Sequence, residues 1–135
     1  MNGMALRYAL AAVLHPELAP LMQGLTRGWW HHGAGDYLST HSAAAHDSDA
    51  TGCGLLFLAY LHAGLGHAWP AIVRTGGSTL AVTYAALTGA DAGHAYPAFM
   101  QALAPCVDHA GGLVLQAHGS PWRARTPVDL PRADP

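Results

Sequence analysis

The sequence predicts an all-α fold, a small irregular bundle of about five short helices around a central apolar helix at about residues 50–65. Within that segment, leucines recur at three- and four-residue spacing, at Leu55, Leu58, Leu61 and Leu65. Other apolar residues extend this surface over most of the circumference, which is typical of a helix packed on by neighbours on all sides. No run of residues shows a convincing strand pattern, so helices are expected throughout.

The central helix has clear start and stop signals. Ser48, Asp49 and Thr51 can each cap its start, because their side-chain oxygens can accept the free amide hydrogens of a first turn. Gly64 and Gly66 can supply the left-handed conformation that ends it. A bilayer needs roughly 20 apolar residues in one helix, and this segment is shorter. The sequence therefore gives no reason to expect a membrane partner.

The N-terminal part is predicted to hold two shorter helical pieces. Residues 5–14 form the first, and Pro16 ends it because the residue before proline is pushed out of the α region. Residues 18–25 form another turn or two, which Gly24 or Gly28 would end. Residues 29–48 are rich in glycine and polar residues and are predicted to be a long polar loop, with Trp29 and Trp30 anchoring it to the core.

The C-terminal half is predicted to add three helices. They cover residues 71–75, 79–87, with Ser78 as the cap and Gly89 as the stop, and 96 to about 107. Residues 113–115 form either a short strand or coil. Residues 1–115 are thus predicted to be one helical domain. Residues 116–135 contain four prolines and three arginines without periodicity, which predicts a disordered tail.

Composition excludes some partners and favours one. Hydrophobic residues make up 51% of the chain and charged residues only 10%. With no lysine and a formal net charge of −2, there is no electrostatic case for nucleic acid or an anionic membrane. So few charges leave a largely uncharged surface, which favours a protein partner. Residues 1–20 lack the apolar core of a signal peptide, and the sequence does not indicate a compartment.

Histidines and carboxylates in the predicted loop are the candidate metal ligands. The candidates are His31, His32, Asp36, His41 and His46. Imidazoles and carboxylates on a flexible loop can bind zinc, nickel or copper. However, His41 and His46 are five residues apart rather than the four of a helical ligand pair. The alternative is a polar surface loop in a lysine-free chain, and both interpretations stay open.

No catalytic residues are predicted. Cys53 lies inside the apolar central helix, where it is expected to be a small buried side chain that is hard to ionise. The sequence has no G-x-S-x-G nucleophile motif and no H-E-x-x-H zinc motif. His62 and His67 flank the end of the central helix and are expected to interact with its C-terminal carbonyl groups.

Two blocks, residues 2–8 and residues 52–61, carry a resemblance to a known family, together with shorter matches after them. The second block reads Gly52-Cys53-Gly54-Leu55-Leu56-Phe57-Leu58-Ala59-Tyr60-Leu61, followed by Leu65-Gly66, Ile72-Val73, Thr79-Leu80-Ala81, Tyr84, Leu87-Thr88-Gly89 and Phe99. This pattern resembles the C-terminal helical lobe of gluzincin-type zinc metallopeptidases, including the basic secretory protein group and related bacterial proteins. The resemblance spans about residues 2–103.

The resemblance implies a peptidase lobe without its catalytic half. In those families a glutamate supplies the third zinc ligand, and Asn2 stands at that position here; an amide is a poor zinc ligand beside a carboxylate. The favoured function is therefore a truncated or degenerate, non-catalytic domain that packs against a partner lobe or chain, using the apolar stripe of the first helix. No cofactor is expected in that case.

Two alternatives would involve zinc. The chain could be part of an active zinc metallopeptidase whose H-E-x-x-H segment lies upstream or on another chain. It could instead be a small metal-binding helical module that uses the loop of histidines and aspartates described above.

Overall fold

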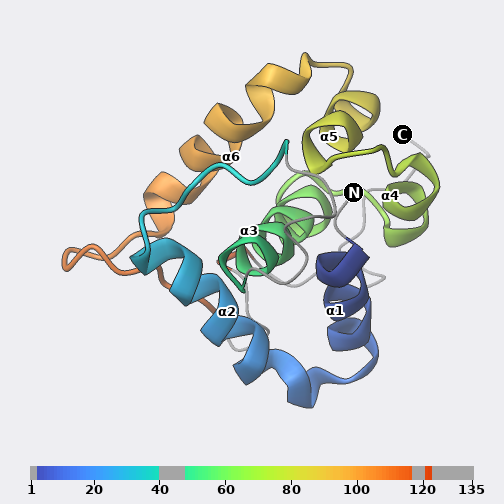
Figure 1. Ribbon diagram of the computed structural model, residues 1–135. Coiled ribbons are helices and arrows are strands. Elements are labelled where there is room, and N and C mark those ends of the chain that lie inside the picture. The colour runs from blue at the N-terminus through green and yellow to red at the C-terminus, as the bar shows by residue number, and fades with distance from the viewer. Residues whose placement is uncertain (1–2, 40–47, 117–120, 123–135) are drawn as a thin grey trace, which may run out of the picture.

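The computed structural model describes residues 3–39, 48–116 and 121–122, and these residues form an all-α bundle, as predicted (Figure 1). Helix α3 lies at the centre, and the other helices surround it. The helices are α1 (Gly3–Leu14), α2 (Ala19–His31), α3 (Ser48–Ala59), α4 (Trp69–Thr75), α5 (Leu80–Thr88) and α6 (Ala95–Leu103). The described residues contain no strand; Val107 and Leu113 form an isolated antiparallel bridge.

The central helix has the predicted position and environment. Every residue of α3 from Ala50 to Leu58 is buried. The helix continues as a π-helical turn, Tyr60–Gly64, in which the backbone hydrogen bonds reach one residue further than in an α-helix. Gly66 has a φ of 87°, which confirms it as the left-handed residue after the helix, whereas Gly64 lies inside the π turn.

Helices α2 and α3 pack so closely that their contact requires a glycine. A Cβ atom added to Gly52 would overlap the carbonyl oxygen of Leu25 and lie 3.2 Å from the amide nitrogen of Thr26. Both atoms belong to the backbone of α2, so no change of side-chain rotamer could make room. Gly52 therefore sets the distance between the two helices.

Helix α2 is longer than predicted. One or two helical turns were predicted at residues 18–25, followed by a loop at 29–48. This prediction is wrong at both ends of the loop, because α2 continues to His31 and α3 starts at Ser48. Gly24 and Gly28 lie within α2 rather than ending it. The buried residues of α2, at three- or four-residue spacing, are Ala19, Met22, Thr26 and Trp29. Their packing outweighs the local preference of the glycines.

The C-terminal helices agree with the predictions in position and differ at their ends. Thr79, rather than Ser78, caps α5, because its hydroxyl accepts the backbone N–H of Val82 at 3.1 Å. Gly89, with a φ of 77°, ends α5 as predicted. Helix α6 ends at Leu103, before the expected residue 107, and a 3₁₀ turn, Ala104–Cys106, follows it.

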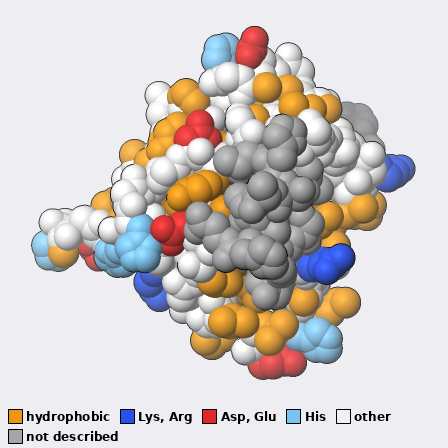
Figure 2. All heavy atoms as spheres, viewed as in Figure 1, with side chains coloured by type: hydrophobic (Ala, Val, Ile, Leu, Met, Phe, Trp, Pro, Cys, Tyr) orange, Lys and Arg blue, Asp and Glu red, His pale blue; other side chains and the backbone are white. Residues whose placement is uncertain are grey.

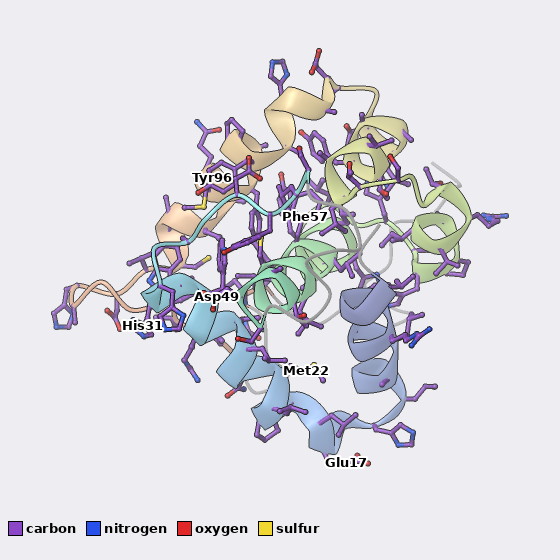
Figure 3. The ribbon with its side chains drawn as sticks, in the orientation of Figure 1. Glu17, Met22, His31, Asp49, Phe57 and Tyr96 are labelled. Atoms are coloured by element: carbon purple, nitrogen blue, oxygen red, sulfur yellow. The ribbon has the colours of Figure 1, made fainter. Side chains whose placement is uncertain are left out.

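Aromatic side chains form the centre of the core (Figure 3). The ring of Phe57 lies 5.2 Å from that of Phe99 in an edge-to-face arrangement. Trp29 is fully buried and stacks on Phe99, with ring centroids 5.6 Å apart. The indole N–H of Trp29 donates to the carbonyl oxygen of Gly35 at 2.8 Å. The predicted anchoring role of Trp29 is confirmed, although this residue lies in a helix and not in a loop.

After α6 the chain makes a tight loop that projects from the body beyond the end of α2 (Figure 1). The Asp108 carboxylate accepts the backbone N–H groups of Ala110 and Gly112, each at 2.9 Å, and Gly111 has a φ of 84°. Trp30 in α2 donates its indole N–H to the carbonyl oxygen of Gly111 at 2.8 Å. The loop is therefore fixed internally and tied to α2.

Two described residues that follow this loop in the sequence contact the bundle. The side-chain amide of Gln23 in α2 donates to the carbonyl oxygen of Gln116 at 3.1 Å. Further along, the ring of Trp122 lies 5.5 Å from that of Tyr60. Within the predicted disordered tail, residues 116–135, the structure describes residues 116, 121 and 122, of which Gln116 and Trp122 contact the bundle. For residues 117–120 and 123–135 that prediction lies outside the described residues.

Candidate functional site

The candidate site lies where the end of α2 meets the start of α3. His31 is the last residue of α2 and is exposed; His32 follows it directly. The Nδ1 atom of His32 lies 2.9 and 3.0 Å from the two carboxylate oxygens of Asp49, in the first turn of α3. Figure 3 shows His31 and Asp49 at this same end of the two helices. The fold thus brings together an imidazole and a carboxylate that are 17 residues apart.

The His32–Asp49 pair has the charges that are favourable at the two helix ends. A carboxylate in the first turn of α3 faces the partial positive charge of that helix terminus, and an imidazole after the last turn of α2 faces a partial negative charge. Protonation of His32 makes the contact an ion pair. Asp49 was expected as a helix cap; the structure places it in the first turn of α3, where its carboxylate contacts His32. The pair holds the two helices together, and it also offers two ligand types that zinc uses.

Among the remaining candidate metal ligands, Asp36 has a local structural contact of its own. Asp36 is exposed, and its carboxylate accepts the backbone N–H of Leu38 at 3.0 Å, which shapes the turn before that buried leucine. His41 and His46 lie outside the described residues. Within the part of the chain that the structure describes, no three His, Cys, Asp or Glu side chains form a metal-binding group. The metal site therefore stays a prediction.

Cys53 is buried in the core, as predicted. Its side chain is fully inaccessible, and both cysteines of the chain are free thiols. Burial, the largest cause, raises the pKa of the Cys53 thiol from its ordinary value of 9.0 to about 12; a backbone hydrogen bond at Tyr37 lowers it, and the charge of Asp36 raises it. Only the thiolate is a good nucleophile or metal ligand. Cys53 is therefore protonated, and a poor nucleophile, at neutral pH.

The two thiols are expected to differ in reactivity. At pH 8, a disulfide reagent such as dithionitrobenzoate should react slowly with the half-buried Cys106, whose pKa burial also raises, and leave Cys53 intact in the folded protein. Both should react in concentrated urea. Rapid reaction of two thiols per folded chain would contradict the burial of Cys53. A Cys53→Ala variant, which keeps Cys106 alone, shows which of the two thiols reacts in the folded protein.

The same pKa shift predicts a loss of stability at alkaline pH. The unfolded chain releases the Cys53 proton near pH 9, whereas the folded chain holds it until about pH 12. The free energy of unfolding should therefore fall as the pH rises through this range. In the Cys53→Ala variant, the free energy of unfolding should depend less steeply on pH in this range. An unchanged pH dependence in the variant would show that Cys53 does not cause it.

A second group of polar residues surrounds the end of the π turn. The imidazole of His62 donates from Nδ1 to the carbonyl oxygen of His67 at 2.8 Å, because a carbonyl can only accept. Its ring stacks on Trp69 with centroids 4.7 Å apart and an interplanar angle of 23°. His62 therefore closes the turn between α3 and α4 and interacts with a carbonyl group beyond the helix end.

The sequence analysis missed two aromatic contacts. The Tyr96 hydroxyl in α6 donates to the carbonyl oxygen of Ala34 at 2.6 Å, which ties the turn after α2 to the last helix. Trp122 packs on Tyr60. The available signal for Trp122 was a single large aromatic residue in a segment that otherwise lacks apolar periodicity.

The fold and these contacts define a small all-α bundle with an aromatic core. Comparisons with protein-family models, curated proteins and solved structures found no match to this chain. None of the helices in the described ranges is long and apolar enough to cross a membrane.

Proposed function

We propose that this chain is a non-catalytic helical domain, related to the C-terminal lobe of gluzincin-type zinc metallopeptidases, that packs against a partner lobe or chain. The observation that carries the proposal is an exposed apolar corner where α1 meets α2. Leu14, the last residue of α1, is 75% exposed, and Leu21 in α2 is 55% exposed.

The apolar corner lies at the turn that contains Glu17 (Figures 2 and 3). Hydrophobic side chains gather at this edge of the molecule beside an acidic side chain and a histidine. Between the two leucines the chain forms the 3₁₀ turn Pro16–Leu18, and Pro20 is also exposed. Two large exposed leucines around one turn are typical of a contact surface, since burying them against a partner would remove apolar area from water.

The residues that carry the family resemblance support the same proposal, because they build the core. Phe57, Leu58 and Leu61 of the second block are buried, and so are Tyr84 and Phe99 of the later matches. Gly52 in the same block sets the contact between α2 and α3. The pattern therefore specifies how a helical lobe packs. Asn2, which stands at the family's ligand position, lies outside the described residues.

The partner surface can be tested by site-specific crosslinking in cells that produce the protein. A photoreactive amino acid at position 14 or 21 should give one crosslinked species of the same mass. The matched control is position 94, an exposed histidine in the 3₁₀ turn Ala92–His94. No product at positions 14 and 21, or the same product at position 94, would contradict the proposed surface. The Leu14→Ser and Leu21→Ser variants should change the free energy of unfolding by less than about 0.5 kcal/mol.

The non-catalytic character is tested by metal content and hydrolysis. We expect the purified chain, dialysed without chelator, to contain no stoichiometric zinc by elemental analysis and to leave casein uncleaved. About one zinc per chain together with casein cleavage would overturn the proposal and favour the peptidase alternative. An in-frame H-E-x-x-H encoded upstream of Met1 would point the same way.

The metal-binding module is the second candidate function, and the His32–Asp49 contact favours it. If it is correct, the quadruple variant of His31, His32, His41 and His46 to alanine should lose zinc uptake in a calorimetric titration. The control is a His94→Ala/His109→Ala variant, which removes two exposed histidines elsewhere in the chain. Equal uptake in both variants, or none in the unaltered chain, would exclude this function.

A further inference from the structure

Helix α2 lies at the outer edge of the bundle, and one of its faces is exposed (Figure 1). The buried residues of α2 share the side of the helix that packs on the core. Glu17 and His31 lie at the two ends of the helix (Figure 3). We define the outer face of α2 as the exposed residues Glu17, Pro20, Leu21, Gly24, Arg27 and His31.

The outer face of α2 places a projecting side chain next to bare backbone. Leu21 is 55% exposed. Gly24, three residues further on, is also exposed, and a Cβ atom built on it meets nothing within 4 Å. Residues three apart in an α-helix are neighbours on its surface. The leucine and the glycine therefore form a knob beside a hole, and a second helix with the same two features could fill the hole with its own leucine.

The described structure itself does not require a glycine at position 24. Gly24 lies inside α2, does not have a positive φ, and has room for a side chain. A glycine in a helix interior is less favourable than alanine, and one of its uses is to let another backbone approach closely. Gly52 has this use within the chain, towards α2. Gly24 offers the same close approach to a helix from outside.

The charges on the outer face of α2 fit a pairing of two identical helices. Glu17, with a side chain that is 70% exposed, lies in the 3₁₀ turn that leads into α2, and Arg27 is exposed near the other end of the helix. Antiparallel helices that place Leu21 opposite Gly24 also place position 17 opposite position 28, beside Arg27. A carboxylate and a guanidinium group would thus meet at both ends of the contact.

We propose that the partner is a second copy of this chain, and that the outer faces of the two α2 helices pack antiparallel across a two-fold axis. Leu21 of each copy lies over Gly24 of the other, and Glu17 of each copy pairs with Arg27 of the other. A two-fold contact requires a surface that complements itself, and this face has a knob beside a hole and opposite charges at its two ends. A formal net charge of −2 gives little repulsion between the copies. This inference rests on the proposed function, since Leu21 belongs to its contact surface, and it names the occupant.

Sedimentation equilibrium of the full chain tests the dimer. The apparent mass should rise with protein concentration from that of one chain to twice that mass. Leu21→Ser removes the knob and Gly24→Leu fills the hole, so each should weaken dimerisation by about tenfold or more. Val82→Ser and Ala86→Leu make the same changes on the exposed side of α5 and should leave the dimer unaltered. Circular dichroism should show all four variants to be helical. A chain that keeps the mass of one copy at every concentration, or a dimer that neither α2 variant weakens, would overturn the proposal.

Reversal of charge tests the antiparallel register. Glu17→Arg and Arg27→Glu each bring like charges together at both ends of the contact, so each should weaken dimerisation by roughly tenfold at low salt. Glu17→Arg/Arg27→Glu restores opposite charges and should return the dissociation constant towards that of the unaltered chain. This recovery is expected only if both residues act in one contact between identical chains. A double variant that dimerises as weakly as the single variants would overturn the proposal.

Photocrosslinking at position 21 separates this inference from the proposed function. The crosslinked species should have twice the mass of the chain and contain only its peptides. A single crosslinked species with a different protein would overturn this inference and leave the proposed contact surface standing. No crosslinked species at all would contradict both.

Discussion

Gly52→Ala is expected to lower the free energy of unfolding by about 3 kcal/mol. The added methyl group would overlap the carbonyl oxygen of Leu25, which belongs to the backbone of α2. Because backbone atoms cannot change rotamer, the two helices must separate. Separation weakens the packing of Met22, Thr26 and Trp29, which are the buried residues of α2 nearest to this point in the sequence.

Helix propensity acts in the opposite direction and is too small to compensate. Alanine is more favourable than glycine in a helix interior by about 1 kcal/mol. Gly24→Ala isolates this term, because a Cβ atom at Gly24 in α2 meets nothing within 4 Å. It should raise the free energy of unfolding by up to about 1 kcal/mol.

Urea unfolding followed by circular dichroism compares the two variants. We expect opposite signs, with Gly52→Ala below the unaltered chain and Gly24→Ala above it. If Gly52→Ala does not fold, the loss exceeds the stability of the chain and the sign is still clear. A Gly52→Ala variant that is as stable as Gly24→Ala would show that α2 and α3 do not pack as closely as the structure has them.

A helix could be predicted where its apolar pattern and its start or end residues lie within one segment of the sequence. The central helix was predicted because its apolar residues cover most of the circumference, and the end of α5 was predicted because a glycine such as Gly89 readily takes up a left-handed conformation. The length of α2 was not predicted. Gly24 and Gly28 indicate a helix end locally, but the packing of Trp29 against Phe99, 70 residues away, keeps this segment helical.

The candidate site was predictable only as a set of residue types. His31 and His32 were recognised as candidate ligands, but the partner of His32 is Asp49, which depends on how α2 and α3 are placed together. Asp36 was expected among the ligands, and the structure uses its carboxylate to form a turn. Trp122 was missed because its contact with Tyr60 involves one side chain in a segment without helical periodicity.

Trp29→Ala is the other substitution with a large expected effect. Trp29 is fully buried, stacks on Phe99 and lies 6.1 Å from Trp30. Its indole N–H also holds the carbonyl oxygen of Gly35 in the turn after α2. Removing the ring leaves a cavity and releases this turn, so the free energy of unfolding should fall by about 3–5 kcal/mol.

Trp29→Phe separates the two contributions. Trp29→Phe keeps an aromatic ring against Phe99 and removes the hydrogen-bond donor to Gly35. The lost hydrogen bond and the smaller ring should lower the free energy of unfolding by about 1–3 kcal/mol, which is less than for Trp29→Ala. Ala34, next to Gly35, has a φ of 51° and accepts the Tyr96 hydroxyl. The backbone N–H of Ala34 donates to the carbonyl oxygen of Trp29, and that of Leu38 donates to the Asp36 carboxylate. If the Trp29 side-chain hydrogen bond holds this strained turn, Trp29→Phe should increase amide hydrogen exchange at Ala34 and Leu38. Equal exchange in Trp29→Phe and the unaltered chain would show that Tyr96 and Asp36 hold the turn without Trp29.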